Sequence, residues 1–255
     1  MINCVCHYSG GLSSHLAAFR AVERFGAEST VLLFADTKSE DADTYRFIRE
    51  GAAALGCRLE VVCDGRTIWQ VMRDERFLAN SMVDPCSRVL KREALNAWCK
   101  LHAPNAVHVL GYTACERQRG DGLRERFDGE VWFPLMDNPT VSKQQVEPEF
   151  REYFPTIAVP RLYGLGASHN NCGGGCVKAG HAHFKWLLET LPDVYAEWER
   201  EEQGMRDFLG KDVSILTDRR CDGKKKPITL RQFRERIERG QSLPLFQASV
   251  SCMCA

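Results

Sequence analysis

The sequence lacks an excess of charge of either sign, because 34 Lys and Arg residues are balanced by 34 Asp and Glu residues. A net charge near zero gives no overall attraction to a polyanion, so recognition of a nucleic acid would have to depend on a local surface. No apolar run approaches the length of a transmembrane helix. An apolar strand pattern begins almost at Met1 and leaves no room for a signal peptide, so we expect a cytosolic protein with no membrane partner.

Two common glycine-rich nucleotide signatures, G-x-x-x-x-G-K-[ST] and G-x-G-x-x-G, are also absent. A Gly-Gly pair nevertheless stands in Tyr8-Ser-Gly-Gly-Leu-Ser-Ser14, between an apolar strand and an amphipathic helix. Glycines let the backbone approach a ligand closely, and the free N–H groups at a helix start suit a phosphate. An ordinary capped strand-to-helix turn is the alternative. We expect a phosphate-binding cradle formed by Ser9, Gly10, Gly11, Leu12, Ser13 and Ser14.

Strands and helices alternate up to about Pro139. The alternation predicts an α/β fold, a doubly wound parallel sheet with right-handed crossovers. Residues 1–139 should form a nucleotide-binding domain, and residues 140–255 a mainly helical C-terminal region with a cysteine-rich loop and tail. We expect strands at 3–7, 29–35, 58–62, 106–110 and 130–133, and helices at 12–25, 41–55, 67–73, 87–101, 142–153, 177–191 and 192–209. Asp36 and Thr37 follow the second strand at its carboxyl end, the edge where open α/β sheets bind ligands.

Cysteine, in contrast, is abundant, with 12 residues. In a reducing compartment, metal binding or redox chemistry is a more common use of so many thiols than a disulfide framework. Cys172 and Cys176 bracket three glycines, a turn that can fold both sulfurs onto one metal or cluster, and Cys86 is the best third ligand. Three thiolates leave one iron of a cubane, or one position on a zinc ion, open. A glycine-rich loop with incidental cysteines is the alternative.

Other details of the cysteine pattern are less specific. Cys176 should begin a helix, whose dipole favours the thiolate. A zinc site could recruit His169, whereas His181 and His183 lie on different faces of a helix. The terminal pair Cys252 and Cys254 could complete a cluster, carry sulfur or resolve a disulfide, or belong to an idle tail. We expect the remaining thiols to pack as small hydrophobes: Cys4, Cys6, Cys57, Cys63, Cys99, Cys115 and Cys221.

With these motifs in place, the chain resembles the PP-loop ATP pyrophosphatases, specifically the phosphoadenosine phosphosulfate (PAPS) reductase-like family and its iron–sulfur-containing branch. Ser9–Ser14 resembles the Ser-Gly-Gly-x-Asp-Ser loop, and Asp36-Thr37 the Asp-Thr-Gly after the second strand. Further similar segments are Cys86-Ser-Arg-Val-Leu-Lys91, Gly111 with Glu116 and Arg119, and Phe133-Pro-Leu-Met-Asp137. The Glu-Cys-Gly-Leu-His signature of true PAPS reductases is absent, which argues against sulfate assimilation and favours relatives such as tRNA thiolation and DNA phosphorothioation enzymes.

The resemblance implies an adenylating sulfurtransferase. ATP would bind in the cradle beside Gly111, with Asp36 orienting the nucleotide or a Mg²⁺ ion. Arg88, Lys91 and Arg119 would neutralise phosphate charge. Sulfur held on a [4Fe-4S] cluster at Cys86, Cys172 and Cys176 would then displace the activated oxygen. The implied partners are ATP, a sulfur donor and a nucleic-acid or small-molecule acceptor, and a homodimer is one option for the assembly.

Two other interpretations stay open. One is a thiol-dependent reductase of adenylyl or phosphoadenylyl sulfate, in which the cysteines form disulfides and bind no iron. The other is a nucleotide-binding module without turnover, in which zinc holds the 172–176 loop. Ser13 and Lys38 support the binding module, since they replace the Asp and Gly that the PP-loop pattern places at these two positions.

Overall fold

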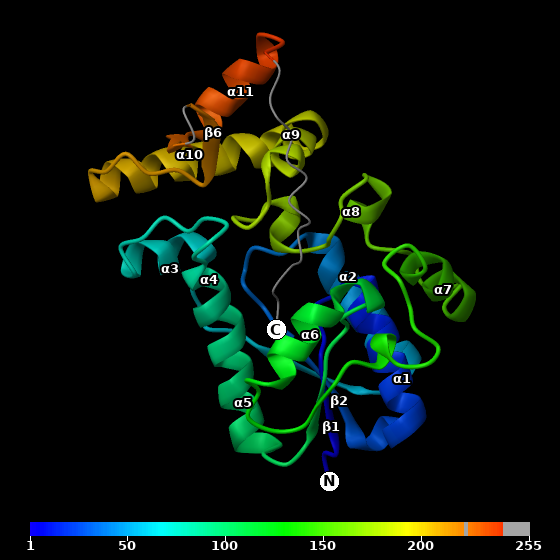
Figure 1. The fold of residues 1–255 in the computed structure, drawn as a ribbon. Helices are drawn as coiled ribbons and strands as arrows, with labels where there is room; N and C mark the ends of the chain where they lie inside the picture. Colours follow the sequence, from blue (N-terminus) through cyan, green and yellow to red (C-terminus); the bar gives the residue numbers. More distant parts are fainter. Residues whose placement is uncertain (222–223, 242–255) are drawn as a thin grey trace.

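The computed structural model describes residues 1–221 and 224–241 of the chain (Figure 1). One five-stranded sheet has the order β3-β2-β1-β4-β5, and every neighbouring pair is parallel. The predicted α/β class, with a doubly wound parallel sheet, is therefore confirmed. The chain builds the sheet outward from β1 in one direction and then returns to add β4 on its other side, so a topological switch point lies between β1 and β4. The strands are β1 Cys4–His7, β2 Thr30–Ala35, β3 Arg58–Val62, β4 Val107–Val109 and β5 Val131–Trp132.

Helices cover both faces of this sheet, as Figure 1 shows. On one face α1 (Leu12–Phe25), α2 (Ala42–Leu55) and α7 (Val146–Tyr153) bury an apolar cluster with alternate residues of β1 and β2. On the other face α5 (Ala94–His102) packs over the intervening residues. This division follows from the alternation of side chains along a strand. Cys4 and Cys6 lie fully buried under α1, so their predicted packing role is confirmed.

The C-terminal helices stand over the carboxyl edge of the sheet (Figure 1). They are α9 His181–Thr190, α10 Pro192–Leu209 and α11 Leu230–Glu238. A hairpin of β6 (Leu216–Cys221) and β7 (Lys224–Ile228) lies between α10 and α11. This helical C-terminal region matches the prediction, although the hairpin and α11 were not expected, because their sequence is rich in charge and poor in apolar alternation. Within the described residues, no helix is long and apolar enough to cross a membrane.

Packing crosses the expected boundary at residue 139 in both directions. α3 (Ile68–Asp74) packs with the C-terminal helices, and the rings of Trp69 and Trp198 lie 5.0 Å apart. Conversely, α7 packs against α1. The division at residue 139 stays a prediction.

The remaining short elements are α4 Pro85–Ser87, the π-helical turn η2 Arg88–Glu93, α6 Arg117–Arg124, α8 Arg161–Gly164, and the 3₁₀ turns η1 Ala27–Ser29, η3 Ala114–Glu116, η4 Pro134–Met136 and η5 Cys172–Gly174.

One buried carboxylate, Glu202, joins α10 to the hairpin and to α11. Its two oxygens accept hydrogen bonds from the backbone N–H of Ile215 at 2.9 Å and of Leu230 at 2.6 Å. Burial raises the pKa of Glu202 from 4.5 to about 7, despite these two donors. The folded state thus binds a proton more tightly than the unfolded chain, and the stabilising effect of that proton is lost as the pH rises.

We therefore expect the free energy of unfolding to fall by about 3 kcal/mol between pH 4.5 and pH 7 on account of Glu202 alone. The Glu202→Gln variant should lose this part of the pH dependence, whereas Glu197→Gln, at an exposed position of α10, should keep it. Urea denaturation at a series of pH values measures the effect. Identical pH profiles for all three proteins would show that Glu202 does not titrate in this range.

Candidate functional site

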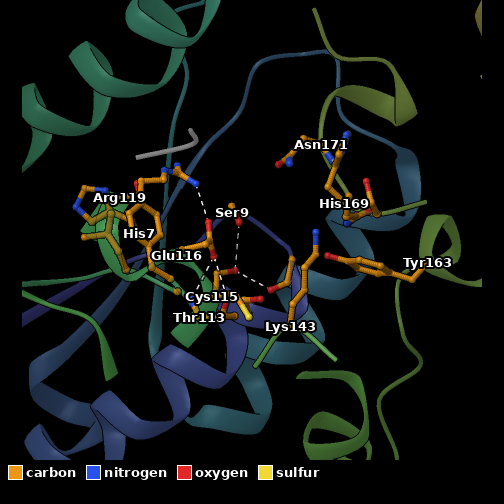
Figure 2. A pocket seen from close by; sticks show the side chains of 18 of the residues that line it. His7, Ser9, Thr113, Cys115, Glu116, Arg119, Lys143, Tyr163, His169 and Asn171 are labelled. Carbon is orange, nitrogen blue, oxygen red and sulfur yellow. Dashed lines mark hydrogen bonds and ion pairs between the residues drawn. The ribbon is translucent and has the colours of Figure 1, made fainter. Parts of the chain in front are cut away.

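A pocket of about 480 Å³ opens where the loops after β1 and β4 diverge, at the switch point of the sheet. This volume is in the range of small-molecule sites. Its walls come from three stretches of the chain, residues 7–14, 110–119 and 163–171, with Lys143 added from the segment before α7. In Figure 2, Glu116 and Arg119 lie on one side of the pocket and Tyr163, His169 and Asn171 on the other, with Ser9 and Lys143 between them.

The loop that was predicted to bind phosphate forms the floor of the pocket. The Ser14 hydroxyl donates to the carbonyl of Gly11 at 2.7 Å, and the Ser9 hydroxyl donates to Ser14 Oγ at 3.3 Å. Gly10 adopts a φ of +76°, and a Cβ there would lie 2.6 Å from Thr44 Cγ2, so the turn requires glycine. The pocket is lined by Ser9, Gly11, Ser13, Ser14 and Gly111, while Leu12 packs in the core below.

Gly111 brings the β4 loop into contact with the first turn of α1. A Cβ at this position would lie 2.6 Å from the Ser13 carbonyl oxygen and 2.7 Å from the Ser14 nitrogen, both backbone atoms. The two loops that form the pocket therefore meet at a position where only glycine fits. This is a physical reason for Gly111 that the sequence alone did not provide.

Three further residues complete the cradle from the C-terminal side of the pocket. The Asn170 amide donates to the Gly10 carbonyl at 3.0 Å. Tyr163 and Lys143 line the pocket, Lys143 as an exposed cation. The sequence alone does not reveal them, because they lie more than 120 positions from the cradle loop and follow no local pattern. Cys115, expected to be a packing residue, is exposed and lines the pocket instead.

The basic residues expected at the site differ in their placement. Arg119 lines the pocket, pairs with Glu116 at 2.8 Å and lies 4.1 Å from the Tyr112 ring centroid. Arg88 is half-buried and pairs with Glu75 and Glu93. Lys91, three residues later, is buried. They separate because they lie in a π-helical turn, in which residues three apart do not share a face as they do in an α-helix.

The structure does not place Asp36 and Thr37 on the large pocket. Asp36 accepts hydrogen bonds from the Tyr45 hydroxyl at 2.7 Å and from the Lys38 N–H at 2.8 Å. Thr37 is buried and donates its hydroxyl to Glu40 at 2.9 Å. The side chain of Thr37 lines a second cavity, which also contains the cysteines.

This second cavity, of about 30 Å³, brings together the three expected ligands Cys86, Cys172 and Cys176. Two lysines line it as well, and each pairs with a buried acid: Lys91 with Glu40 at 3.6 Å and Lys178 with Asp84 at 3.5 Å. Glu40 Oε2 also accepts the N–H of Cys172 at 2.8 Å. Cys172 has a φ of 51°, a conformation that non-glycine residues rarely adopt. The terminal pair Cys252 and Cys254 lies outside the described residues.

The Cys176 thiol is the most acidic of the three, but not for the reason expected. α9 begins at His181, after a turn in which the Ala179 N–H bonds to the Cys176 carbonyl, so the prediction that Cys176 starts a helix was wrong. The pKa of Cys176 lies below its usual value because the Cys172 thiol donates to its sulfur, with smaller contributions from the Lys178 N–H and Lys91. Burial raises the pKa of Cys86 to about 12.

The three thiols that line this cavity are donors that both iron–sulfur clusters and zinc ions accept. Two lysines lie beside these thiols, each also paired with a buried carboxylate. Burial lowers the pKa of Lys91, but Glu40 and the thiols outweigh this effect and keep the side chain protonated. The three sulfurs, all in the described part of the chain, are not all within 4.8 Å of one another. At least one pair of them is therefore farther apart than two ligands of one metal ion would be.

A narrow cavity of about 20 Å³ lies between the two sites. It shares His7 and Ser9 with the large pocket and Lys91 with the cysteine cavity. One loop also borders both sites, since residues 168–171 line the pocket while Cys172 and Cys176 line the cavity. A ligand in the pocket and a group held by the cysteines would therefore be close neighbours.

No protein-family model matches the chain, and no curated protein matches it. Among solved structures, a crystal structure of phosphoadenylyl-sulfate (PAPS) reductase from Candida auris in a phosphate complex is similar to it. The match covers 66% of this chain and 79% of the reductase, with 18% identity and a TM-score of 0.46. A similarity of this size does not assign an activity to this chain.

Proposed function

We propose that this protein is an ATP-dependent, adenylating sulfurtransferase that uses a [4Fe-4S] cluster held by Cys86, Cys172 and Cys176. The observation that carries the proposal is the connection between the two sites: a phosphate-type cradle and a three-thiol cavity border the same loop and the same narrow cavity. An activated intermediate formed in the pocket would lie beside the sulfur chemistry that consumes it.

The cradle supplies the nucleotide site. The free N–H groups at the start of α1 and the hydroxyls of Ser9 and Ser13 would bind the phosphates of ATP. Lys143 and Arg119 would neutralise charge as pyrophosphate leaves. Mg²⁺ would accompany the phosphates, with Glu116 as an acidic side chain of the same pocket.

The proposed reaction has two displacements. An oxygen of the acceptor attacks the α-phosphorus of ATP and pyrophosphate leaves, so the acceptor oxygen becomes part of an adenylate. A sulfur nucleophile then replaces that oxygen, and AMP leaves with it. The cluster, when bound, supplies an iron that can hold a sulfur ligand. Lys91 and Lys178 place two ammonium groups beside the three thiols, while Glu40 and Asp84 pair with these ammonium groups in turn. The acceptor would be a nucleic acid or a small molecule.

One observation favours a second candidate, a thiol-dependent reductase of adenylyl or phosphoadenylyl sulfate. Cys172 donates a hydrogen bond to Cys176, so the two sulfurs are already in contact. Oxidation of this pair to a disulfide would release two electrons, the number needed to convert the bound sulfate group into sulfite. The free disulfide would then have to be reduced by an external thiol.

Two measurements on protein purified under strict anaerobiosis separate these candidates. The sulfurtransferase should be brown, with a broad band near about 400 nm and iron matched by acid-labile sulfide. It should also release AMP and pyrophosphate from ATP once an acceptor and a sulfur donor such as sulfide are present, and tRNA, DNA and small molecules can be screened as acceptors in that assay. A colourless protein that stays free of iron after reconstitution, and forms a Cys172–Cys176 disulfide with adenylyl sulfate, would overturn the proposal in favour of the reductase.

The cradle can be tested separately through Gly111→Ala. The new methyl group would meet the backbone of Ser13 and Ser14 at 2.6–2.7 Å, so the β4 loop must move away from α1. We expect Mg-ATP affinity to fall at least about tenfold and stability to fall by about 1–3 kcal/mol. Isothermal titration and thermal unfolding measure the two effects.

Gly122→Ala is the matched control. This glycine lies in α6 and an added Cβ would meet nothing within 4 Å, so the change should raise helix stability slightly and leave ATP binding unaltered. Unchanged ATP affinity in Gly111→Ala would show that the cradle does not hold the nucleotide.

A further inference from the structure

A second group of metal-ligating side chains lies on the face of the sheet covered by α5. His7 ends β1, His108 lies in β4 and Cys99 lies in α5. The parallel register pairs Val5 with His108. Since side chains alternate along a strand, Val5, His7 and His108 all face α5. Three separate elements thus bring two imidazoles and one thiol to one buried point.

The ligand atoms of these residues all lie within 4.8 Å of one another, and His7 Nε2 is 3.0 Å from His108 Nδ1. For tetrahedral zinc, bonds of about 2.0 Å to nitrogen and 2.3 Å to sulfur place the ligand atoms roughly 3.3–3.7 Å apart. Small side-chain rotations would reach this geometry. All three side chains are buried, His7 at 8%, Cys99 at 4% and His108 at 8% exposure. They extend from two strands and a helix, so their positions are fixed by the fold.

We propose that His7, Cys99 and His108 form a binding site for one divalent transition-metal ion of the zinc class. The donor set of two imidazoles and one thiolate is one that zinc accepts. Burial keeps both imidazoles neutral, the form that binds a metal, and metal binding would release the Cys99 proton. The Nδ1 atom of His7 is buried and has no hydrogen-bond partner in the described part of the chain, so it can serve a water or a ligand group of the pocket.

The fourth position of this site would face the narrow cavity described above. His7 and Leu95, one turn before Cys99, both line that cavity, and its volume of about 20 Å³ exceeds the 10–15 Å³ that a single water needs. Three protein ligands and one exchangeable water are typical of zinc sites that take part in chemistry, whereas structural zinc sites have four protein ligands. None of its ligands is a cluster ligand, although His7 also lines the large pocket.

Metal binding by the full-length chain tests the proposal. Because the other reactive thiols could also bind metal, the background variant carries serine at Cys86, Cys172, Cys176, Cys252 and Cys254. Titration with Co²⁺ should give one equivalent bound, with the intense visible bands of tetrahedral cobalt and a near-ultraviolet thiolate-to-cobalt band. Zn²⁺ should displace the cobalt and remove these bands.

Two ligand variants in the same background make the test specific. Cys99→Ala should remove the thiolate-to-cobalt band, and His108→Gln should weaken cobalt binding at least about tenfold while keeping part of that band. Cys57→Ser, at a half-buried thiol elsewhere in the sheet domain, should change neither. Circular dichroism confirms that each variant is folded. Absence of tetrahedral cobalt in the background variant, or an unchanged band in Cys99→Ala, would overturn the site.

Discussion

Replacing Cys172 or Cys176 with serine should remove essentially all iron and acid-labile sulfide from the anaerobically purified protein. Both side chains line the same cavity as Cys86, and each is one of the three proposed cluster ligands. A serine hydroxyl is a hard, weakly acidic donor and cannot replace a thiolate on iron. Sulfur transfer should be lost with the cluster, while Mg-ATP binding in the separate pocket should persist.

Cys57→Ser is the matched control for this prediction. Cys57 is half-buried and its thiol donates to the Leu55 carbonyl. It does not line the cavity that contains Cys86, Cys172 and Cys176. Iron content should therefore be unchanged. Equal loss of iron in Cys57→Ser, Cys172→Ser and Cys176→Ser would contradict the ligand assignment, because it would indicate a general effect on folding.

The two metal sites can also be separated in one preparation. Zinc bound at His7, Cys99 and His108 should remain when Cys172 is replaced, because the two proposed metal sites have no protein ligand in common. Cys99→Ala should conversely lose zinc and keep iron. A preparation that always loses both metals together would mean that one site depends on the other, and the assignment of two independent sites would fail.

The sheet could be predicted from the sequence because its central strands β1 and β2 are short, almost entirely apolar and fully buried segments at the start of a regular strand–helix alternation. The cradle followed for the same reason, as Gly10 and Gly11 stand between a strand and a helix. The cysteine cavity could be predicted from the spacing of Cys172 and Cys176 and from the turn that contains Cys86. These features could be predicted because each is formed mainly by residues close together in the sequence.

The failures have a common physical origin in long-range packing. Arg88 and Lys91 were both expected to neutralise phosphate charge, but a π-helical turn separates their side chains, and no sequence pattern marks that turn. Tyr163 and Asn170 reach the cradle only through the path of the chain between α7 and α9. Cys99 had no partner within several residues, and its neighbours His7 and His108 come from other elements.

Lys91→Met should be the most destabilising single change at the site, with a loss of about 3–5 kcal/mol. Lys91 is buried and pairs with Glu40, whose side chain is only 1% exposed. Methionine fills a similar volume but carries no charge. The buried Glu40 carboxylate would therefore lose its ion-pair partner. The same change should weaken cluster retention, because one of the two ammonium groups beside the thiols is gone.

A double-mutant cycle distinguishes the buried charge from the shape of the side chain. If the cost comes from an uncompensated carboxylate, Glu40→Gln should recover a large part of the stability of Lys91→Met, since the amide can still accept from the Cys172 N–H. Lys100→Met, an exposed lysine on α5, should change stability by no more than about 0.5 kcal/mol. Urea denaturation of the four proteins of the cycle measures the coupling. Additive effects of the two substitutions would mean that Lys91 stabilises the cavity by packing, and the role of its charge beside the cluster would have to be abandoned.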